Sequence, residues 1–365
     1  MRFTSPLKFS DSFLRKISPN KKIRKKQTPK TNSPKKQTNS PKKTLKKQTF
    51  TQKKPTIYDE IHNCILSILN VDVKIFDKLF TDYTKLFHKS KLNTPIQICK
   101  DQLTCGMYGK IYKVKDQHAI VKTYEKRKID YIIQENMIHI LLYCLQTRLK
   151  KCFSHPIPNC IPKIYKFVKK PQKMTMMEYL DTTTKFIFLN QNFKAEKDFL
   201  LALMYILYFL QQTTNFTHRD LHYDNVMLKN LDHLETTQIY IDGKKVTELY
   251  LNYRVYLIDF GFSCLSFKKC VIDLPDIVSG DFYKSKICTN KSHDPRLFLA
   301  SIYFSRTSNI SLQLYYYLKK LFTPYEKLEN FNTFKYQHHF FYNNVIDIDD
   351  PNFYPQNIIL NLMKL

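Results

Sequence analysis

Residues 96–124 alternate apolar and polar side chains with the period of β-strands. Three such stretches follow one another at 96–103, 110–115 and 119–124, separated by turns at Gly106 to Gly109 and at Asp116-Gln117. Because successive side chains of a strand point to opposite faces, this alternation predicts three strands joined by short turns. A helical period follows at 127–149, and two further strands are expected at 163–169 and 173–180.

The second half is dominated by helical patterns. Residues 195–212 are apolar nearly all round, which predicts a buried helix, and 295–365 are mostly helical. Short strands are expected at 226–228 and 255–258, and the alternation between them, around Asp242-Gly243, predicts a hairpin. A strand-rich half before a helix-rich half predicts an α+β protein of two lobes.

Residues 1–55 differ in composition from the rest. They hold 18 Lys or Arg against one acid, a charge of +17 out of the +28 of the whole chain, and repeat phrases such as PKKQT. Such a segment cannot bury enough apolar surface to offset its ordering entropy, so we expect a disordered tail. Residues 56–95 return to a helical pattern, which predicts a helical N-terminal extension.

The charge of the tail bears on its partners and on where the protein acts. A basic arm favours anionic partners, and we expect non-specific nucleic-acid binding through residues 1–55, with a mere solubilising arm as the alternative. The longest apolar run, 199–210, is too short for a membrane span, so no membrane association is expected. Single cysteines without a CxxC pair argue against zinc and, with no visible secretory signal, favour a soluble intracellular protein.

The residues with the clearest chemistry lie at 218–225, which read His-Arg-Asp-Leu-His-Tyr-Asp-Asn. Phosphoryl transfer needs a carboxylate that accepts the proton of the attacking hydroxyl, and an amide oxygen nearby for a metal ion that bridges phosphates. Asp220 and Asn225 supply this pair on one short loop. Asp259 follows an apolar strand and precedes Phe260-Gly261, a place where a carboxylate can bind magnesium.

These motifs resemble the catalytic loop and the D-F-G of eukaryotic-type serine/threonine protein kinases, over about 96–304. The resemblance implies a bilobal kinase-like fold, ATP as phosphate donor and Mg²⁺ held by Asn225 and Asp259. It gives Lys122 the role of the strand lysine that contacts the phosphates, with Glu135 as its ion-pair partner. The backbone of Glu178 and Leu180 would contact adenine. The loop that covers the phosphates corresponds to Thr104, Cys105, Gly106, Met107, Tyr108, Gly109, Lys110, Ile111 and Tyr112.

The chain also departs from the kinase pattern. Thr104 stands where the first glycine of the phosphate loop is usual, and His222 replaces the lysine that follows the catalytic aspartate. We therefore expect His222, together with Asp220, to act at the reacting phosphate. No A-P-E follows Asp259. An H-R-D-L-H loop without A-P-E is similar to haspin-like kinases and to kinases of large DNA viruses, and the AT-rich coding bias and basic leader favour the viral group.

The sequence thus predicts four parts: the tail 1–55, the extension 56–95, a small β-rich lobe 96–180 and a larger helical lobe 181–365 with a hairpin insert at about 230–254. The predicted function is ATP-dependent transfer to serine or threonine of a protein substrate. Serine or threonine is preferred because 222–224 lack the Ala-Arg of tyrosine kinases. Two alternatives stay open: a small-molecule phosphotransferase of the same fold, and an inert kinase-like domain in a DNA-binding or packaging protein.

Overall fold

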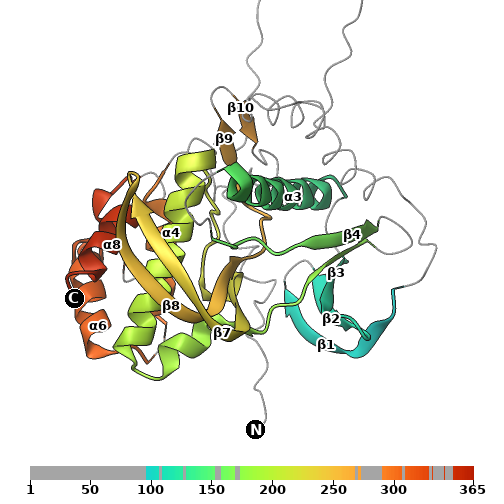
Figure 1. Cartoon of the computed structure of the whole chain (residues 1–365), viewed down its shortest axis with the longest axis horizontal. Coiled ribbons are helices and arrows are strands. Elements are labelled where there is room, and N and C mark those ends of the chain that lie inside the picture. The colour runs from blue at the N-terminus through green and yellow to red at the C-terminus, as the bar shows by residue number, and fades with distance from the viewer. Residues whose placement is uncertain are drawn as a thin grey trace, which may run out of the picture. The chain divides into compact units, whose positions relative to one another are not determined.

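The computed structural model describes residues 96–106, 109–125, 129–152, 158–168, 173–267, 270–272, 290–305, 309–328, 331, 341 and 348–365. The expectations for the tail, for the 56–95 extension and for Met107 and Tyr108 lie outside these residues. The described residues form helices and antiparallel sheets, which confirms the α+β class (Figure 1).

The elements follow the predicted order closely. They are β1 (Ile98–Gly106), β2 (Gly109–Val114), β3 (Ala119–Tyr124), α3 (Ile129–Cys152), β4 (Ile164–Val168), β5 (Met174–Glu178), β6 (Thr182–Thr183), η1 (Thr184–Leu189), α4 (Phe193–Thr214), η2 (Tyr223–Asn225), β7 (Val226–Ile241), β8 (Lys244–Leu257), β9 (Leu265–Phe267), β10 (Cys270–Ile272), α5 (His293–Tyr303), α6 (Leu312–Glu326), η5 (Pro351–Phe353) and α8 (Pro355–Leu362).

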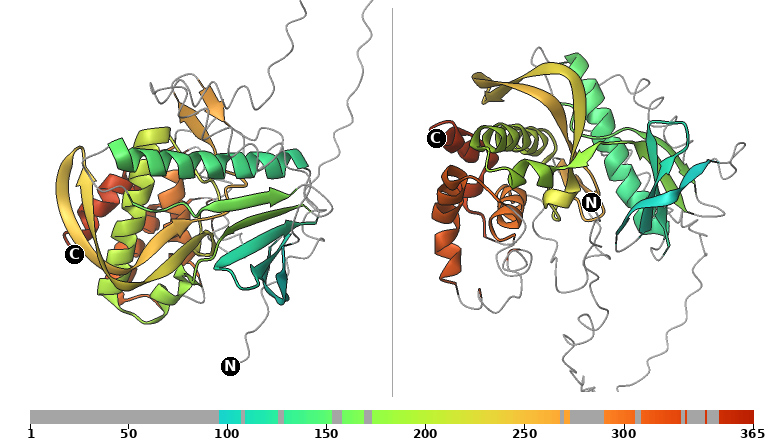
Figure 2. Two further views of the ribbon diagram at one scale, coloured as in Figure 1. Left: turned by 45° about the vertical axis from the view of Figure 1, so that its right-hand side comes forward. Right: turned by 90° about the horizontal axis from the view of Figure 1, so that it is seen from below.

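The first five strands form one antiparallel sheet in the order β1-β2-β3-β5-β4. The register places Lys122 of β3 opposite Ile111 on one neighbour and opposite Thr175 on the other. Helix α3 runs beside this sheet (Figure 2), and a side chain of each strand β3 and β5 bonds to it, Lys122 to Glu135 and Thr175 to Asn136. The sheet therefore presents Lys122 to the helix from a central strand.

Helix α4 lies in the core of the second half, as its apolar sequence predicts. Its N-cap, Asn192, accepts a hydrogen bond from the Ala195 N–H, and the helix ends at Asn215, which adopts the left-handed conformation common at C-termini. Its Glu196 is buried and accepts hydrogen bonds from both the N–H and the hydroxyl of Ser311. None of the described helices has the length and apolar character needed to cross a membrane.

The hairpin between β7 and β8 differs from the expected arrangement of two short strands and a separate hairpin. Pairing of β7 with β8 extends from Val226 opposite Leu257 to Ile241 opposite Lys244, with register irregularities between Asn230 and Glu235 and between Ile239 and Tyr240. The predicted Asp242-Gly243 turn is present, with both residues at positive φ as a tight two-residue turn requires. The hairpin lies beside α4 (Figures 1 and 2), and Tyr208 donates to the Asp242 carboxylate at 2.9 Å.

Gly109 is required by close backbone packing. A Cβ atom at this position would lie 1.7 Å from the Thr123 carbonyl oxygen on the paired strand. We expect Gly109→Ala to lower the free energy of unfolding by about 3 kcal/mol, the upper part of the range for overpacking. Gly243→Ala is the matched control, because nothing lies within 4 Å of its Cβ position and only its φ of +77° opposes a side chain.

Urea denaturation of both glycine variants tests this prediction. The control should lose about 1 kcal/mol, the cost of a left-handed conformation for a residue with a side chain. Equal losses for Gly109→Ala and Gly243→Ala would show that the approach of β3 to β2 does not constrain this position.

Candidate functional site

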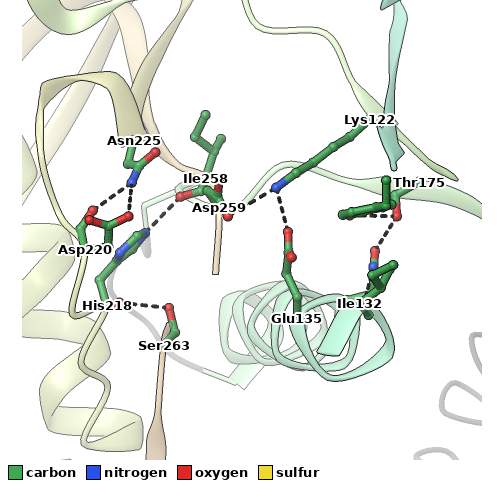
Figure 3. Close-up of polar contacts among 12 residues, drawn as sticks. Lys122, Ile132, Glu135, Thr175, His218, Asp220, Asn225, Ile258, Asp259 and Ser263 are labelled. Atoms are coloured by element: carbon green, nitrogen blue, oxygen red, sulfur yellow. Dashed lines mark hydrogen bonds and ion pairs between the residues drawn. The ribbon is translucent and has the colours of Figure 1, made fainter. Parts of the chain in front are cut away.

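Lys122 joins two carboxylates that come from distant parts of the chain. Its Nζ lies 2.8 Å from Oε1 of Glu135 on α3 and 3.2 Å from Oδ1 of Asp259 after β8 (Figure 3). The Lys122 and Glu135 side chains are nearly buried, whereas that of Asp259 is 41% exposed. Burial alone would lower the pKa of Lys122, but the carboxylates of Asp259 and Glu135 outweigh it and raise the pKa. The lysine is therefore a fixed positive charge beside an accessible carboxylate.

The base of the β7–β8 hairpin holds Asn225 and Asp259 close together. Asn225 directly precedes β7, and the N–H of Ile258, just after β8, donates to the Asn225 carbonyl at 3.0 Å. Figure 3 shows Asp259 between Asn225 and Lys122. Residues more than a hundred positions apart in the sequence thus meet around one point.

Asp220 and His222 share the loop that ends at Asn225. The Asn225 amide nitrogen donates to the Asp220 carbonyl at 2.7 Å and to its Oδ2 at 3.3 Å, and lies 3.1 Å from His222 Nε2. His222 Nε2 is 3.9 Å from Asp220 Oδ1. The loop therefore brings together the expected catalytic pair and the expected amide ligand, with the Asn225 amide oxygen pointing away from Asp220 (Figure 3).

The loop 217–225 is fastened to two other segments. Thr217 and Cys264 exchange backbone hydrogen bonds of 3.0 and 2.9 Å, which places 217–225 beside the strand that follows Asp259. Asp294 of α5 is fully buried and accepts from the N–H groups of His218 and Arg219 at 2.6 and 2.9 Å. Its burial raises the pKa of Asp294 to about 7. Asp294 thus braces the loop.

Buried rings surround Phe260, the residue after Asp259. His139 of α3, His218 and Phe216 have ring centroids 4.9, 5.7 and 6.2 Å from that of Phe260. The Nε2 of His218 bonds to the Ile258 carbonyl at 2.9 Å, and burial lowers the pKa of His218 to about 4. A neutral ring that donates to a backbone carbonyl holds the loop in place, so His218 is structural.

Two residues of the site have a left-handed backbone, which is strained at Arg219 and tolerated at Asp259. Arg219 and Asp259 have φ values of 66° and 61°, in the left-handed region that side chains other than Gly, Asn and Asp seldom adopt. Such conformations persist only where surrounding contacts impose them, and they gather at functional sites. Here the contacts are the Asp294 carboxylate on the Arg219 N–H and the Lys122 ammonium on the Asp259 side chain.

The expected phosphate loop lies on β1 and β2, except for Met107 and Tyr108. Gly106 pairs with Gly109, Cys105 with Lys110 and Thr104 with Ile111, while Tyr112 pairs with Val121 of β3. Because Ile111 of β2 is opposite Lys122 of β3, the expected phosphate loop lies on the strand next to the one that carries the lysine.

The expected adenine contacts lie between β5 and β6. Glu178 ends β5, and its N–H donates to the Lys163 carbonyl at 2.9 Å, so this N–H is already bonded within the protein, and Leu180 is buried. The Glu178 carboxylate pairs with Lys229 of β7. This pair could not be predicted from the sequence, because Lys229 is one of many lysines and lies in no recognisable motif.

His139 also escaped the sequence analysis, and its burial carries a testable consequence. Burial lowers the pKa of His139 from 6.5 to about 4, and its Nε2 bonds to the Pro162 carbonyl at 2.7 Å. Since the folded pKa lies below the unfolded one, the unfolded chain takes up the proton first. The stability contribution is complete above about pH 6.5 and is lost as the pH falls toward 4.

We expect wild type to lose about 2 kcal/mol more than His139→Gln between about pH 7 and about pH 5, measured by urea denaturation. His118→Gln, at an exposed histidine, is the matched control and should follow wild type. An identical pH dependence in wild type and His139→Gln would contradict the prediction.

The fold and the site together define an α+β protein in which the Lys122–Glu135 ion pair, the carboxylates of Asp220 and Asp259 and the amide of Asn225 lie close together. No protein-family model matches the chain. The chain is similar to the protein named "Probable kinase 098L" of Invertebrate iridescent virus 3, with 28% identity over 206 residues. The match covers 55% of this chain and 38% of that viral protein, so the chain spans well under half the length of the relative.

Proposed function

We propose that the chain is a protein kinase of bilobal fold, which transfers the γ-phosphate of ATP to serine or threonine hydroxyls of proteins. The observation that carries the proposal is the double contact of Lys122 with Glu135 and Asp259, close to the Asp220–Asn225 pair. The printed name of the viral relative supports a kinase and agrees with a viral origin.

The residues at the site fit a hard divalent cation. Mg²⁺ prefers oxygen ligands, and Asp259 offers an accessible carboxylate while the Asn225 amide oxygen points away from Asp220 (Figure 3). We infer that these two residues would hold magnesium. When bound, the metal would neutralise negative charge on the ATP phosphates.

The chain's own residues then have distinct roles in the proposed reaction. Lys122 would bind the phosphates from the side of β3, and the backbone of β1 and β2 would cover them. Asp220 would orient the substrate hydroxyl and accept its proton as the new P–O bond forms and the bond to the β-phosphate oxygen breaks, which releases ADP. His222 stands beside Asp220 and would contact the transferred phosphate.

Labelled ATP distinguishes this proposal from its alternatives. Wild type and Asp220→Asn are each incubated with ATP labelled in the γ position and Mg²⁺, once with a protein mixture and once with aminoglycosides and choline. Label on protein serine or threonine with wild type alone is the expected result. Label on the small molecules would favour the small-molecule phosphotransferase, and nucleotide binding without any transfer would favour an inert domain.

A further inference from the structure

Helix α3 buries polar side chains on one face. Glu135, Asn136, His139 and Gln146 are each at most 5% exposed. At 100° per residue these four positions fall within about 100° of the helix circumference, so they form one polar stripe. Burying polar groups is unfavourable unless each has a partner. The partners of the stripe therefore decide how the helix is oriented.

Asn136 belongs to a chain of hydrogen bonds that crosses from the sheet to the helix. Its Oδ1 accepts from the Thr175 hydroxyl of β5 at 2.9 Å, and its Nδ2 donates to the Ile132 carbonyl at 2.7 Å. The Tyr124 hydroxyl of β3 lies 3.2 Å from Thr175 Oγ1. Because Thr175 gives its single hydrogen to Asn136, Tyr124 must be the donor. Burial raises the pKa of Tyr124, which keeps that proton in place.

The other stripe residues bind the segment before β4. His139 bonds to the Pro162 carbonyl at 2.7 Å, and Gln146 Oε1 accepts from the N–H groups of Cys160 and Ile161 at 2.7 and 2.9 Å. A rotation of α3 about its axis would break these bonds together and leave the groups buried and unpaired, which is costly.

The stripe also contains the residue that pairs with Lys122. Glu135 is the neighbour of Asn136 on α3, so a rotation of α3 that breaks the Asn136–Thr175 bond would also withdraw Glu135 from Lys122. We propose that Tyr124, Thr175 and Asn136 form a clamp, a set of positioning residues that holds α3 in the rotation where Glu135 meets Lys122. This inference rests on the proposed kinase function for its consequence, whereas the clamp itself is a property of the fold.

Hydrogen exchange of the full chain tests the clamp directly. Thr175→Val removes the hydroxyl and keeps nearly the same shape, and it should speed exchange of the α3 amides about tenfold. Thr214→Val is the matched control, because Thr214 is equally buried and donates to Leu210 within α4 at 2.6 Å. It should leave α3 exchange unchanged. Tyr124→Phe, which removes only the first donor, gives the same test should Thr175→Val fail to fold. Unchanged α3 exchange in these variants would overturn the proposal.

Nucleotide affinity shows whether the clamp acts through Glu135. Thr175→Val should weaken binding of a non-hydrolysable ATP analogue about fivefold, about 1 kcal/mol at 1.4 kcal/mol per factor of ten. The same substitution made in Glu135→Gln should weaken it less than about twofold, because the pair it positions is already broken. Equal weakening in both backgrounds would overturn the role of Glu135. If wild type binds no ATP analogue, the kinase proposal fails, while the exchange experiment still decides the clamp.

Discussion

Asp220→Asn is expected to reduce phosphoryl transfer at least about a hundredfold, which is about 3 kcal/mol of lost transition-state stabilisation. Asparagine has the same size as aspartate, and its amide oxygen can still accept the hydrogen bond from Asn225 Nδ2. The substitution removes the carboxylate that would accept the hydroxyl proton. The measurement is the initial rate of label transfer to a protein substrate at saturating ATP and Mg²⁺.

Asp224→Asn is the matched control for this experiment. Asp224 lies on the same loop and is 57% exposed, so its replacement removes the same charge from the same surface. We expect its rate to stay within about threefold of wild type. A rate for Asp220→Asn within tenfold of wild type would show that Asp220 is not the proton acceptor.

Removing the carboxylate of Asp259 is expected to reduce phosphoryl transfer as strongly as the Asp220→Asn substitution. Asn is the appropriate replacement because the φ of 61° at this position would strain alanine, whereas asparagine tolerates the left-handed region. Asp259→Asn should reduce transfer at least about a hundredfold and raise the Mg²⁺ concentration that gives half-maximal rate. Asp198→Asn, at a partly buried carboxylate that pairs with Lys194 away from the site, serves as the control. Near wild-type transfer by Asp259→Asn at saturating Mg²⁺ would contradict the proposed metal site.

Much of the fold could be predicted because local signals agreed with one another. The strand over 119–124 and the turn at Asp242-Gly243 carry alternation and turn chemistry that act over a few residues, and the structure has both. The expectation of short strands with a separate hairpin between 226 and 258 was wrong in its boundaries. Periodicity resolves neither the irregularity after Asn230 nor the continuity of pairing across it, since both depend on the partner strand.

For the candidate site, the sequence identified several residues but not the contacts between them. Motifs identified Lys122, Asp220 and Asp259, but the direct Lys122–Asp259 contact depends on how distant segments pack. The helix at 127–149 was expected from its helical period, and Glu135 was expected only as the partner of Lys122. The structure buries Glu135 and Asn136 among the apolar residues, because their partners on β3 and β5 satisfy them. A sequence pattern counts polar residues as exposed and cannot see those partners.

In the long β7–β8 hairpin, separation along the sequence and separation in space differ widely. Asn225 and Asp259 are 34 positions apart along the chain, yet the lowest rung of the ladder, Val226 opposite Leu257, and the Ile258–Asn225 hydrogen bond bring them together. The outer rungs, from Glu235 opposite Leu251 to Ile241 opposite Lys244, lie beyond the part of β7 that pairs with β6 and take no part in this contact. The Asp242-Gly243 tip is therefore a place where a peptide tag or a whole domain can be inserted, with loss of the Tyr208–Asp242 hydrogen bond. Such an insertion is expected to leave the arrangement of Asn225 and Asp259 at the base of the hairpin unchanged.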